Sequence, residues 1–223
     1  MRIGLLTGHK RILVRMHNIF NSNINIEEVA QLPLKQFTGK IIIADNLQSY
    51  RGAIKMIDDR QILGFDTETK PAFKKGQSHK VALLQLSDED TCFIFRLNKI
   101  GLPDELASML SDVKHIKIGL AVKDDIRALS KLKHIHPEGF IDLQKYVEDF
   151  GITDKSLKKL AALIMGFRIS KSQQTSNWEG EKLSEAQLIY AATDAWMCLE
   201  LYKKLKEAEL NHARINQISI KTR

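Results

Sequence analysis

Residues 62–69 read Ile62-Leu63-Gly64-Phe65-Asp66-Thr67-Glu68-Thr69, an apolar run that ends in two carboxylates. The run is apolar on both faces, which is typical of a strand covered on both sides in an α/β sheet. Side chains two residues apart point to the same face of a strand, so we expect Asp66 and Glu68 to project together. Ligands of α/β sheets gather at the carboxyl ends of the strands, where these two acids fall.

Two carboxylates held side by side at the end of a buried strand repel each other unless one is protonated or a cation lies between them. Hard oxygen ligands of this kind suit Mg²⁺ or Mn²⁺. A strand that simply ends in a polar turn has the same composition. Residues 62–69 alone therefore leave a metal site and a plain strand end equally open.

The composition favours a globular protein with a polyanionic partner. The chain has 223 residues, of which 43% are hydrophobic and 27% charged, and its net charge of +7 favours nucleic acid as the partner. No apolar run approaches the roughly 18 residues that span a bilayer, and we see no signal peptide. Cys92 and Cys198 form no CxxC motif, so we expect reduced thiols, a cytoplasmic location and no membrane partner.

Hydrophobic patterning predicts one domain built on a mixed sheet flanked by helices. The strand-like and helical segments follow one another from residue 40 to residue 210. We expect an N-terminal extension of open role over 1–39, the domain over 40–210 and a basic C-terminal tail over 211–223. The expected strands are 40–45, 62–69, 81–86, 91–96, 116–119 and 139–143, and the main expected helices are 46–57, 103–110, 122–132, 157–165 and 185–210.

A tyrosine and an acid stand one turn apart in the last long helical segment. Tyr190 and Asp194 are four residues apart, so they share a helix face. The small residues Ala191 and Ala192 between them let such a helix pack closely. In isolation, this pattern is more often a surface or capping pair than a functional one.

Two adjacent acids lie in the helical segment 122–132. Val122, Ile126 and Leu129 form its apolar stripe. Asp125 lies beside that stripe, whereas Asp124 lies almost opposite and should face water. An acid at the edge of a buried stripe needs a partner, although acids are also favoured by the dipole at a helix N-terminus.

Taken together, these motifs resemble the DEDDy subgroup of the DEDD superfamily of 3′–5′ exonucleases. The first motif is Phe65-Asp66-Thr67-Glu68-Thr69, the second runs from Gly119 to Asp125, and the third is Tyr190-x-x-x-Asp194. The segment 80–86 and Ser176-Asn177-Trp178 are similar to those of the Werner syndrome exonuclease domain and its bacterial relatives. The resemblance covers roughly residues 40–207 and implies a ribonuclease H-like α/β fold with a mixed five-stranded sheet.

The resemblance also implies catalytic roles for the four acids and the tyrosine. Asp66, Glu68 and Asp194 would hold one divalent cation, and Asp66 with Asp125 would hold the other, Mg²⁺ or Mn²⁺ in each case. Tyr190 would orient the attacking water, because its ordinary pKa near 10 makes it a poor base. The implied reaction releases nucleoside 5′-monophosphates from a nucleic acid with a free 3′ end, and the Werner-like features favour DNA over RNA.

Further residues are weaker candidates for substrate binding. They are the polar or basic residues near the first motif and those of the segment before the last helix. Trp178 is a candidate for base stacking, with plain packing as the alternative. The others are Thr67, Lys74, Lys75, Lys80 and Lys171.

Two other functional classes remain open. The pair Asp66 and Glu68 superficially resembles the Asp-x-Asp signature of haloacid dehalogenase-like phosphatases, although that signature has a second Asp. A non-catalytic nucleic-acid-binding module is the other alternative, and the presence of all four acids and Tyr190 speaks against it.

Overall fold

The computed structural model describes residues 19–74 and 76–221, with side chains described as far as residue 215. Lys75, residues 1–18 of the predicted extension and residues 222–223 of the predicted tail lie outside the described residues. The strands are β1 (Lys40–Ala44), β2 (Ile62–Thr69), β3 (Val81–Ser87), β4 (Thr91–Phe95), β5 (Ile116–Gly119) and β6 (Phe140–Asp142). The α-helices are α1 (Ile26–Gln31), α2 (Leu47–Ile57), α3 (Leu97–Ile100), α4 (Asp104–Leu110), α5 (Val122–Ser130), α6 (Leu143–Tyr146), α7 (Leu157–Leu160) and α8 (Glu185–Lys221).

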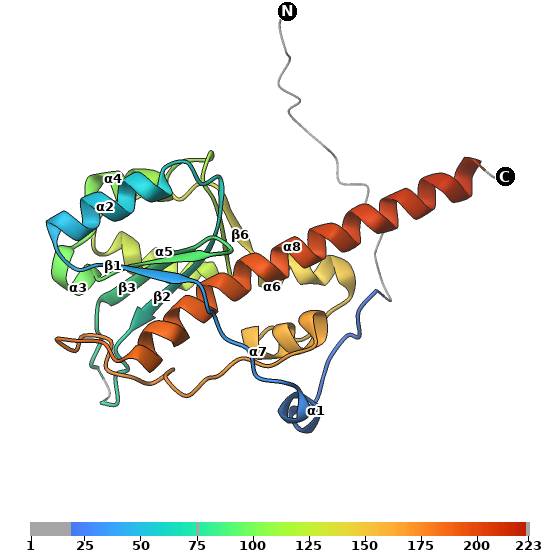
Figure 1. Ribbon diagram of the computed structural model, residues 1–223, viewed down its shortest axis with the longest axis horizontal. Coiled ribbons are helices and arrows are strands. Elements are labelled where there is room, and N and C mark those ends of the chain that lie inside the picture. Colours follow the sequence, from blue (N-terminus) through green and yellow to red (C-terminus); the bar gives the residue numbers. More distant parts are fainter. Residues whose placement is uncertain (1–18, 75, 222–223) are drawn as a thin grey trace, which may run out of the picture.

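A six-stranded sheet in the order β1-β4-β3-β2-β5-β6 forms the centre of the fold (Figure 1). The strands β2, β3 and β4 pair antiparallel, whereas β1 pairs parallel with β4, and β5 and β6 continue parallel from β2. The predicted mixed α/β class is confirmed. The predicted number of five strands is wrong by one, because β1 adds a strand beside β4.

Local signals in the sequence set several of the element boundaries. Asn46 caps α2, since its side chain accepts hydrogen bonds from the backbone N–H groups of Gln48 and Ser49. The turn between β3 and β4 is closed by Asp88, whose Oδ1 accepts from the backbone of Asp90 and Thr91. In both places a short polar side chain accepts hydrogen bonds from backbone N–H groups close to it in the chain.

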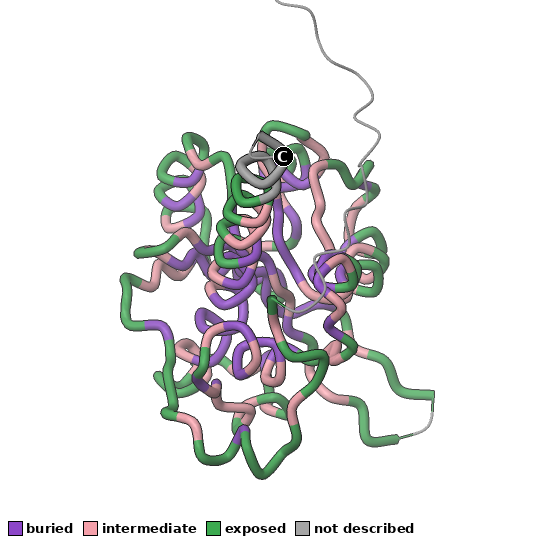
Figure 2. Tube along the Cα trace, turned by 90° about the vertical axis from the view of Figure 1, so that its right-hand side faces the viewer, coloured by how far each residue is buried: buried purple, intermediate pink, exposed green. Residues whose placement is uncertain are grey.

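Helices cover both faces of the sheet. The apolar residues of α2, α4 and α5 pack with Leu63 and Phe65 on one face of β2. On the other face, Ala191 and Ala192 of α8 pack with Leu83 of β3. Figure 2 shows buried residues gathered in the centre of the molecule and exposed residues along its outer loops. The catalytic candidates of β2 therefore lie on the face that α8 covers.

Gly64 allows α8 to approach β2 closely. A Cβ atom at this position would lie 1.9 Å from the carbonyl oxygen of Ala195 in α8, which no side chain can accommodate. The glycine is needed here for space, since its backbone has an ordinary strand conformation. The close approach brings the acids at the end of β2 next to the residues of α8.

The last helix is longer than predicted. It continues past Leu210 to Lys221, so residues 211–221 of the predicted tail extend α8 beyond the body of the domain (Figure 1). None of the described helices, α8 included, combines the length and apolar character that crossing a bilayer requires.

The described part of the N-terminal extension lies against the domain. Leu34 forms a parallel bridge with Arg168, where Lys35 donates to the Arg168 carbonyl and Arg168 donates to the Pro33 carbonyl. The backbone N–H of Phe37 donates to Oγ1 of Thr193 on α8, at 3.0 Å. The extension thus contacts both α8 and the segment that precedes it.

Candidate active site

Three carboxylates meet at the end of β2. Asp66 and Glu68 come from β2 itself, and Asp194 comes from the facing side of α8. Each offers an oxygen atom, and these atoms all lie within 4.8 Å of one another. The alternation of the strand and the close approach of α8 at Gly64 together produce this cluster.

Burial raises the pKa of all three carboxylates, and the charges of neighbouring acids add to the rise for Asp66 and Glu68. Burial is the largest cause for Asp66, followed by the charges of Asp194 and Asp125. Burial followed by the charge of Asp66 raises the pKa of Glu68 to about 10. Burial also raises the pKa of Asp194, and its Oδ1 is buried without a hydrogen-bond partner among the described residues. This oxygen-rich cluster fits a divalent cation, which would favour the ionised carboxylates.

Lys171 places an ammonium group at the same cluster. Its Nζ donates to Oδ2 of Asp194 at 2.6 Å and to the hydroxyl of Tyr190 at 3.4 Å. It also lies 5.2 Å from the centre of the Tyr190 ring. Lys171 was predicted as a substrate contact, and its pairing with an acid of the cluster was not foreseen from the sequence.

Tyr190 is buried next to Asp194 on α8, as the spacing of the two residues predicts. Burial, followed by the charges of Asp194 and Glu68, raises the pKa of its hydroxyl above the ordinary value. The phenol therefore stays protonated across the ordinary pH range. This electrostatic setting suits a hydrogen-bonding role better than that of a general base.

Trp178 supports the tyrosine and is not available for stacking on a nucleotide. Its side chain is 0% exposed, and its ring centroid lies 5.8 Å from that of Tyr190. The predicted substrate contact by Trp178 is therefore wrong, because the residue is enclosed by β3, β4 and α8. Plain packing, the alternative interpretation, describes its position.

Asp125 is held beside the cluster by Thr67. The Thr67 hydroxyl donates to Oδ1 of Asp125 at 2.5 Å. Burial raises the pKa of Asp125 to about 6, and the hydrogen bond from Thr67 opposes that rise. Asp125 lies outside the three-acid group but close enough for its charge to raise the pKa of Asp66. The Thr67 hydroxyl is thus engaged with Asp125, and the predicted substrate contact of Thr67 stays a prediction.

The turn before α5 has an unusual backbone conformation. Ala121 has a φ of 56°, and it is the one non-glycine residue with positive φ in the described ranges. Its backbone N–H donates to Oδ1 of Asp142 at 2.9 Å, which helps to hold this unfavourable conformation.

By contrast with Asp125, the Asp124 side chain is 82% exposed and pairs with Arg127 at 2.7 Å. The helix phase predicted from the apolar stripe is the one observed.

The remaining lysine candidates lie on the loop between β2 and β3. Lys74 and Lys80 are exposed there, and Lys75 lies outside the described residues. Val81, the residue after Lys80, pairs with Thr69 at the end of β2. This register places Lys80 at the same edge of the sheet as the carboxylates.

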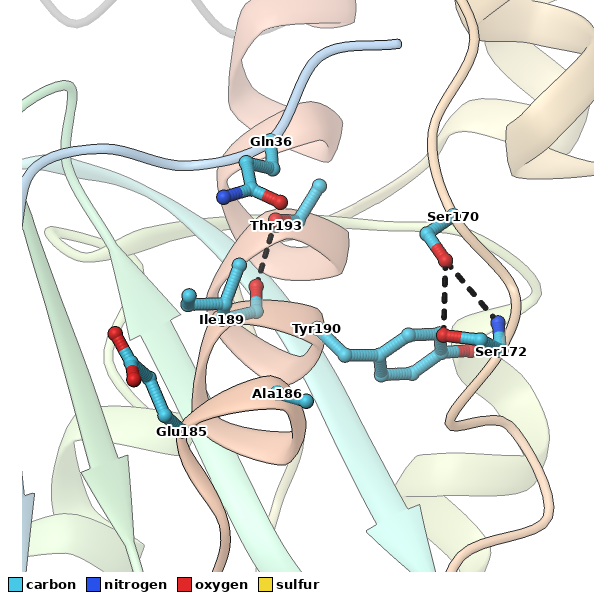
Figure 3. A pocket seen from close by; sticks show the side chains of 8 residues that line it. All are labelled: Gln36, Ser170, Ser172, Glu185, Ala186, Ile189, Tyr190 and Thr193. Carbon is cyan, nitrogen blue, oxygen red and sulfur yellow. Dashed lines mark hydrogen bonds between the residues drawn. The ribbon is translucent and has the colours of Figure 1, made fainter.

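A cavity of about 290 Å³ adjoins Tyr190 (Figure 3). Ser170 and Ser172, which are hydrogen-bonded to each other at 3.0 Å, line one side of it. Gln36 of the N-terminal extension lines another part, near Thr193. The sequence contained no signal for this cavity, because its walls form only when the N-terminal extension, the segment before α8 and α8 itself come together.

The fold and the carboxylate cluster together define a ribonuclease H-like nuclease domain. A family model described as 3′–5′ exonuclease matches residues 41–209, and the chain belongs to this family of hydrolases. The predicted resemblance to the 3′–5′ exonucleases of the DEDD superfamily is thereby confirmed, and the DEDDy subgroup stays a prediction.

Curated relatives agree with this assignment. The chain is 31% identical over 184 residues to the bifunctional 3′–5′ exonuclease/ATP-dependent helicase WRN of Mus musculus, covering 78% of this chain and 13% of that protein. It is 29% identical over 178 residues to DNA polymerase I of Aquifex aeolicus, covering 79% of this chain and 29% of that protein. The chain therefore spans well under half the length of these relatives.

Solved structures show the same fold. The EXO domain of Aedes aegypti Nibbler superimposes with a TM-score of 0.71 at 23% identity, covering 80% of this chain and 94% of that one. Trypanosoma brucei RNase D in complex with RNA U12 superimposes with a TM-score of 0.63 at 19% identity, covering 80% of this chain and 64% of that one. These likenesses confirm the ribonuclease H-like class.

Proposed function

We propose that this chain is a metal-dependent exonuclease that hydrolyses nucleic acid from the 3′ end and releases nucleoside 5′-monophosphates, with DNA as the preferred substrate. The observation that carries the proposal is the convergence of Asp66, Glu68 and Asp194 within 4.8 Å. The match of the chain to the 3′–5′ exonuclease family supports the polarity of the reaction.

The proposed cofactors are two divalent cations, Mg²⁺ or Mn²⁺. Asp66, Glu68 and Asp194 would hold one, and Asp66 with Asp125 would hold the other. Such ions activate water as a nucleophile and stabilise the charge that develops on the leaving oxygen. The residues fit this role because Asp194 has a buried oxygen without a partner among the described residues and all three clustered acids have a raised pKa. The hydrogen bond from Thr67 would keep Asp125 turned toward this site.

The proposed role of Tyr190 is to orient the attacking water through its protonated hydroxyl. The exposed side chains of Lys74 and Lys80, on the loop between β2 and β3, would contact substrate phosphates. The net charge of +7 favours such a polyanion. The preference for DNA is supported by the relative named DNA polymerase I.

The function is tested with one oligonucleotide sequence, made as DNA and as RNA and labelled at either the 3′ or the 5′ end. In Mg²⁺ or Mn²⁺, 3′-labelled DNA should release labelled mononucleotide from the start, whereas 5′-labelled DNA should shorten stepwise. Chelator should stop both, and RNA should react more slowly. Shortening from the 5′ end or activity in chelator would reject the proposal. Binding without mononucleotide release would favour the non-catalytic module, and a trapped aspartyl-phosphate would favour the phosphatase.

The variant Tyr190→Phe tests whether the Tyr190 hydroxyl orients the attacking water or takes part in binding the metal. The variant keeps the ring that packs against Trp178 but loses the hydroxyl. We expect turnover to fall about 10²-fold, within the range that a positioned side chain contributes to proton transfer and orientation. Affinity for Mn²⁺, measured by calorimetry, should stay near that of the wild type. Loss of Mn²⁺ binding would instead make Tyr190 part of the metal site.

A further inference from the structure

The segment that carries Lys171 is bound to the N-terminal extension just before this residue and borders a cavity. Arg168 is bound to the N-terminal extension through its backbone bridge with Leu34, and its Nε donates to the Leu32 carbonyl at 3.1 Å. Ser170 and Ser172 line the cavity beside Tyr190 (Figure 3). The side chain of Lys171, between these two serines, reaches the carboxylates instead. Rotation of the lysine side chain can therefore move the ammonium without breaking the bridge between Arg168 and Leu34.

The contacts of Lys171 make it a counter-cation of the carboxylate cluster. Its ammonium binds Asp194, whose side chain is 5% exposed, whereas the lysine side chain is 28% exposed. The charge of Lys171 lowers the pKa of Asp66, Glu68 and Asp194, opposing the effects of burial and repulsion. The ammonium thus stabilises the ionised form of these acids, which burial and mutual repulsion disfavour.

The same position conflicts with a divalent cation on Asp194. The ammonium lies 2.6 Å from Oδ2 of Asp194, and a divalent cation on the free Oδ1 of the same carboxylate would lie close enough to repel it, with little water between the two cations. The partial exposure of Lys171 offers the side chain a route outward, since four rotatable bonds let the ammonium reach solvent while the backbone stays fixed.

We propose that Lys171 is an exchangeable counter-cation, which holds the carboxylates of the active site together until a divalent cation binds and displaces its ammonium from Asp194. This inference rests on the proposed metal-dependent function. It adds that the contact between Lys171 and Asp194 must break when the divalent cation binds. Metal binding and the lysine contact exclude each other at Asp194. The displaced ammonium is thereby freed at the mouth of the site when the metal is in place.

The test compares melting temperatures with and without metal for the wild type, Lys171→Met and a matched control, Lys159→Met. Lys159 pairs with Asp154 at 2.8 Å with similar exposure, 32% and 14%, away from the carboxylate cluster. In chelator, Lys171→Met should melt about 5 °C below the wild type, because partly buried acids lose their counter-charge. In saturating Mn²⁺, its melting temperature should equal that of the wild type, since the lysine no longer contributes there. Lys159→Met should lower the melting temperature equally in both conditions.

Calorimetry supplies a second measurement that does not depend on the size of the thermal shift. If ammonium and metal compete, Lys171→Met should bind Mn²⁺ about tenfold more tightly than the wild type, as reciprocal coupling requires. Lys171→Arg, which keeps the charge and is included in case the methionine variant does not fold, should bind Mn²⁺ no more tightly than the wild type. Equal destabilisation of Lys171→Met in chelator and in Mn²⁺, unchanged stability in chelator, or weaker Mn²⁺ binding would each overturn the exchange. A wild type without any Mn²⁺-induced stabilisation would reject the metal-dependent function itself.

Discussion

Asp66→Ala should lose nearly all exonuclease activity while the protein remains folded. The charges of Asp194 and Asp125 both raise the pKa of Asp66, and Asp66 is proposed to contact both cations. We expect turnover to fall roughly 10³-fold or more. Removing a single preorganised hydrogen-bond donor from an active site already lowers kcat by about 10²- to 10³-fold. The measurement is mononucleotide release from labelled DNA at saturating Mg²⁺.

Folding is the control for this variant. Removing one of three clustered acids relieves repulsion, so the melting temperature in chelator should be unchanged or higher. Asp59→Ala, an exposed acid just before β2 at the opposite end of the strand, should keep full activity. An Asp66→Ala protein with substantial turnover would refute the assignment of the carboxylate cluster as the catalytic centre.

Asp125→Asn and Asp124→Asn form the second test, because the two adjacent acids have opposite environments. Asp125 accepts a hydrogen bond from Thr67 next to the cluster, whereas Asp124 is exposed and paired with Arg127. Asp125→Asn keeps the size of the side chain but removes the charge proposed to hold the second cation. We expect a loss of turnover of about 10²-fold or more for Asp125→Asn. A change of less than a few-fold is expected for Asp124→Asn, because solvent screens its charge.

Both variants are measured at saturating Mg²⁺ on one labelled oligonucleotide. An inactive Asp124→Asn protein would mean that Asp124, despite its exposure, is the ligand of the second cation. If both variants stay active, Asp125 has no part in the mechanism and the second cation needs another set of ligands.

The sequence predicted the parts of the site that depend on local geometry. The two-residue alternation of β2 brings Asp66 and Glu68 together, and the four-residue spacing on α8 brings Tyr190 and Asp194 together. The apolar stripe of α5 correctly distinguished Asp125 from Asp124. Each of these relations follows from the period of a single helix or strand.

The features missed from the sequence depend on how separate elements dock. The bond between Thr67 and Asp125 exists because α5 packs against β2, and nothing in either segment alone indicates it. Trp178 is buried because α8 and the sheet enclose it, whereas an isolated tryptophan before a helix fits stacking or packing equally well. The end of α8 was placed too early because the polar residues after Leu210 show no apolar stripe that would mark a continuing helix.

The place of α8 in the chain has a consequence for the timing of biosynthesis. Asp66 and Glu68 precede Asp194 by well over a hundred residues, and Gly64 keeps the surface of β2 open for a helix that the ribosome makes much later. At about 5–20 residues per second, the ribosome needs on the order of ten seconds to pass from the first acids to the last one. During that interval the nascent chain holds only part of the carboxylate cluster. A ribosome-bound polypeptide should therefore leave the nucleic acids around it intact until α8 emerges and docks.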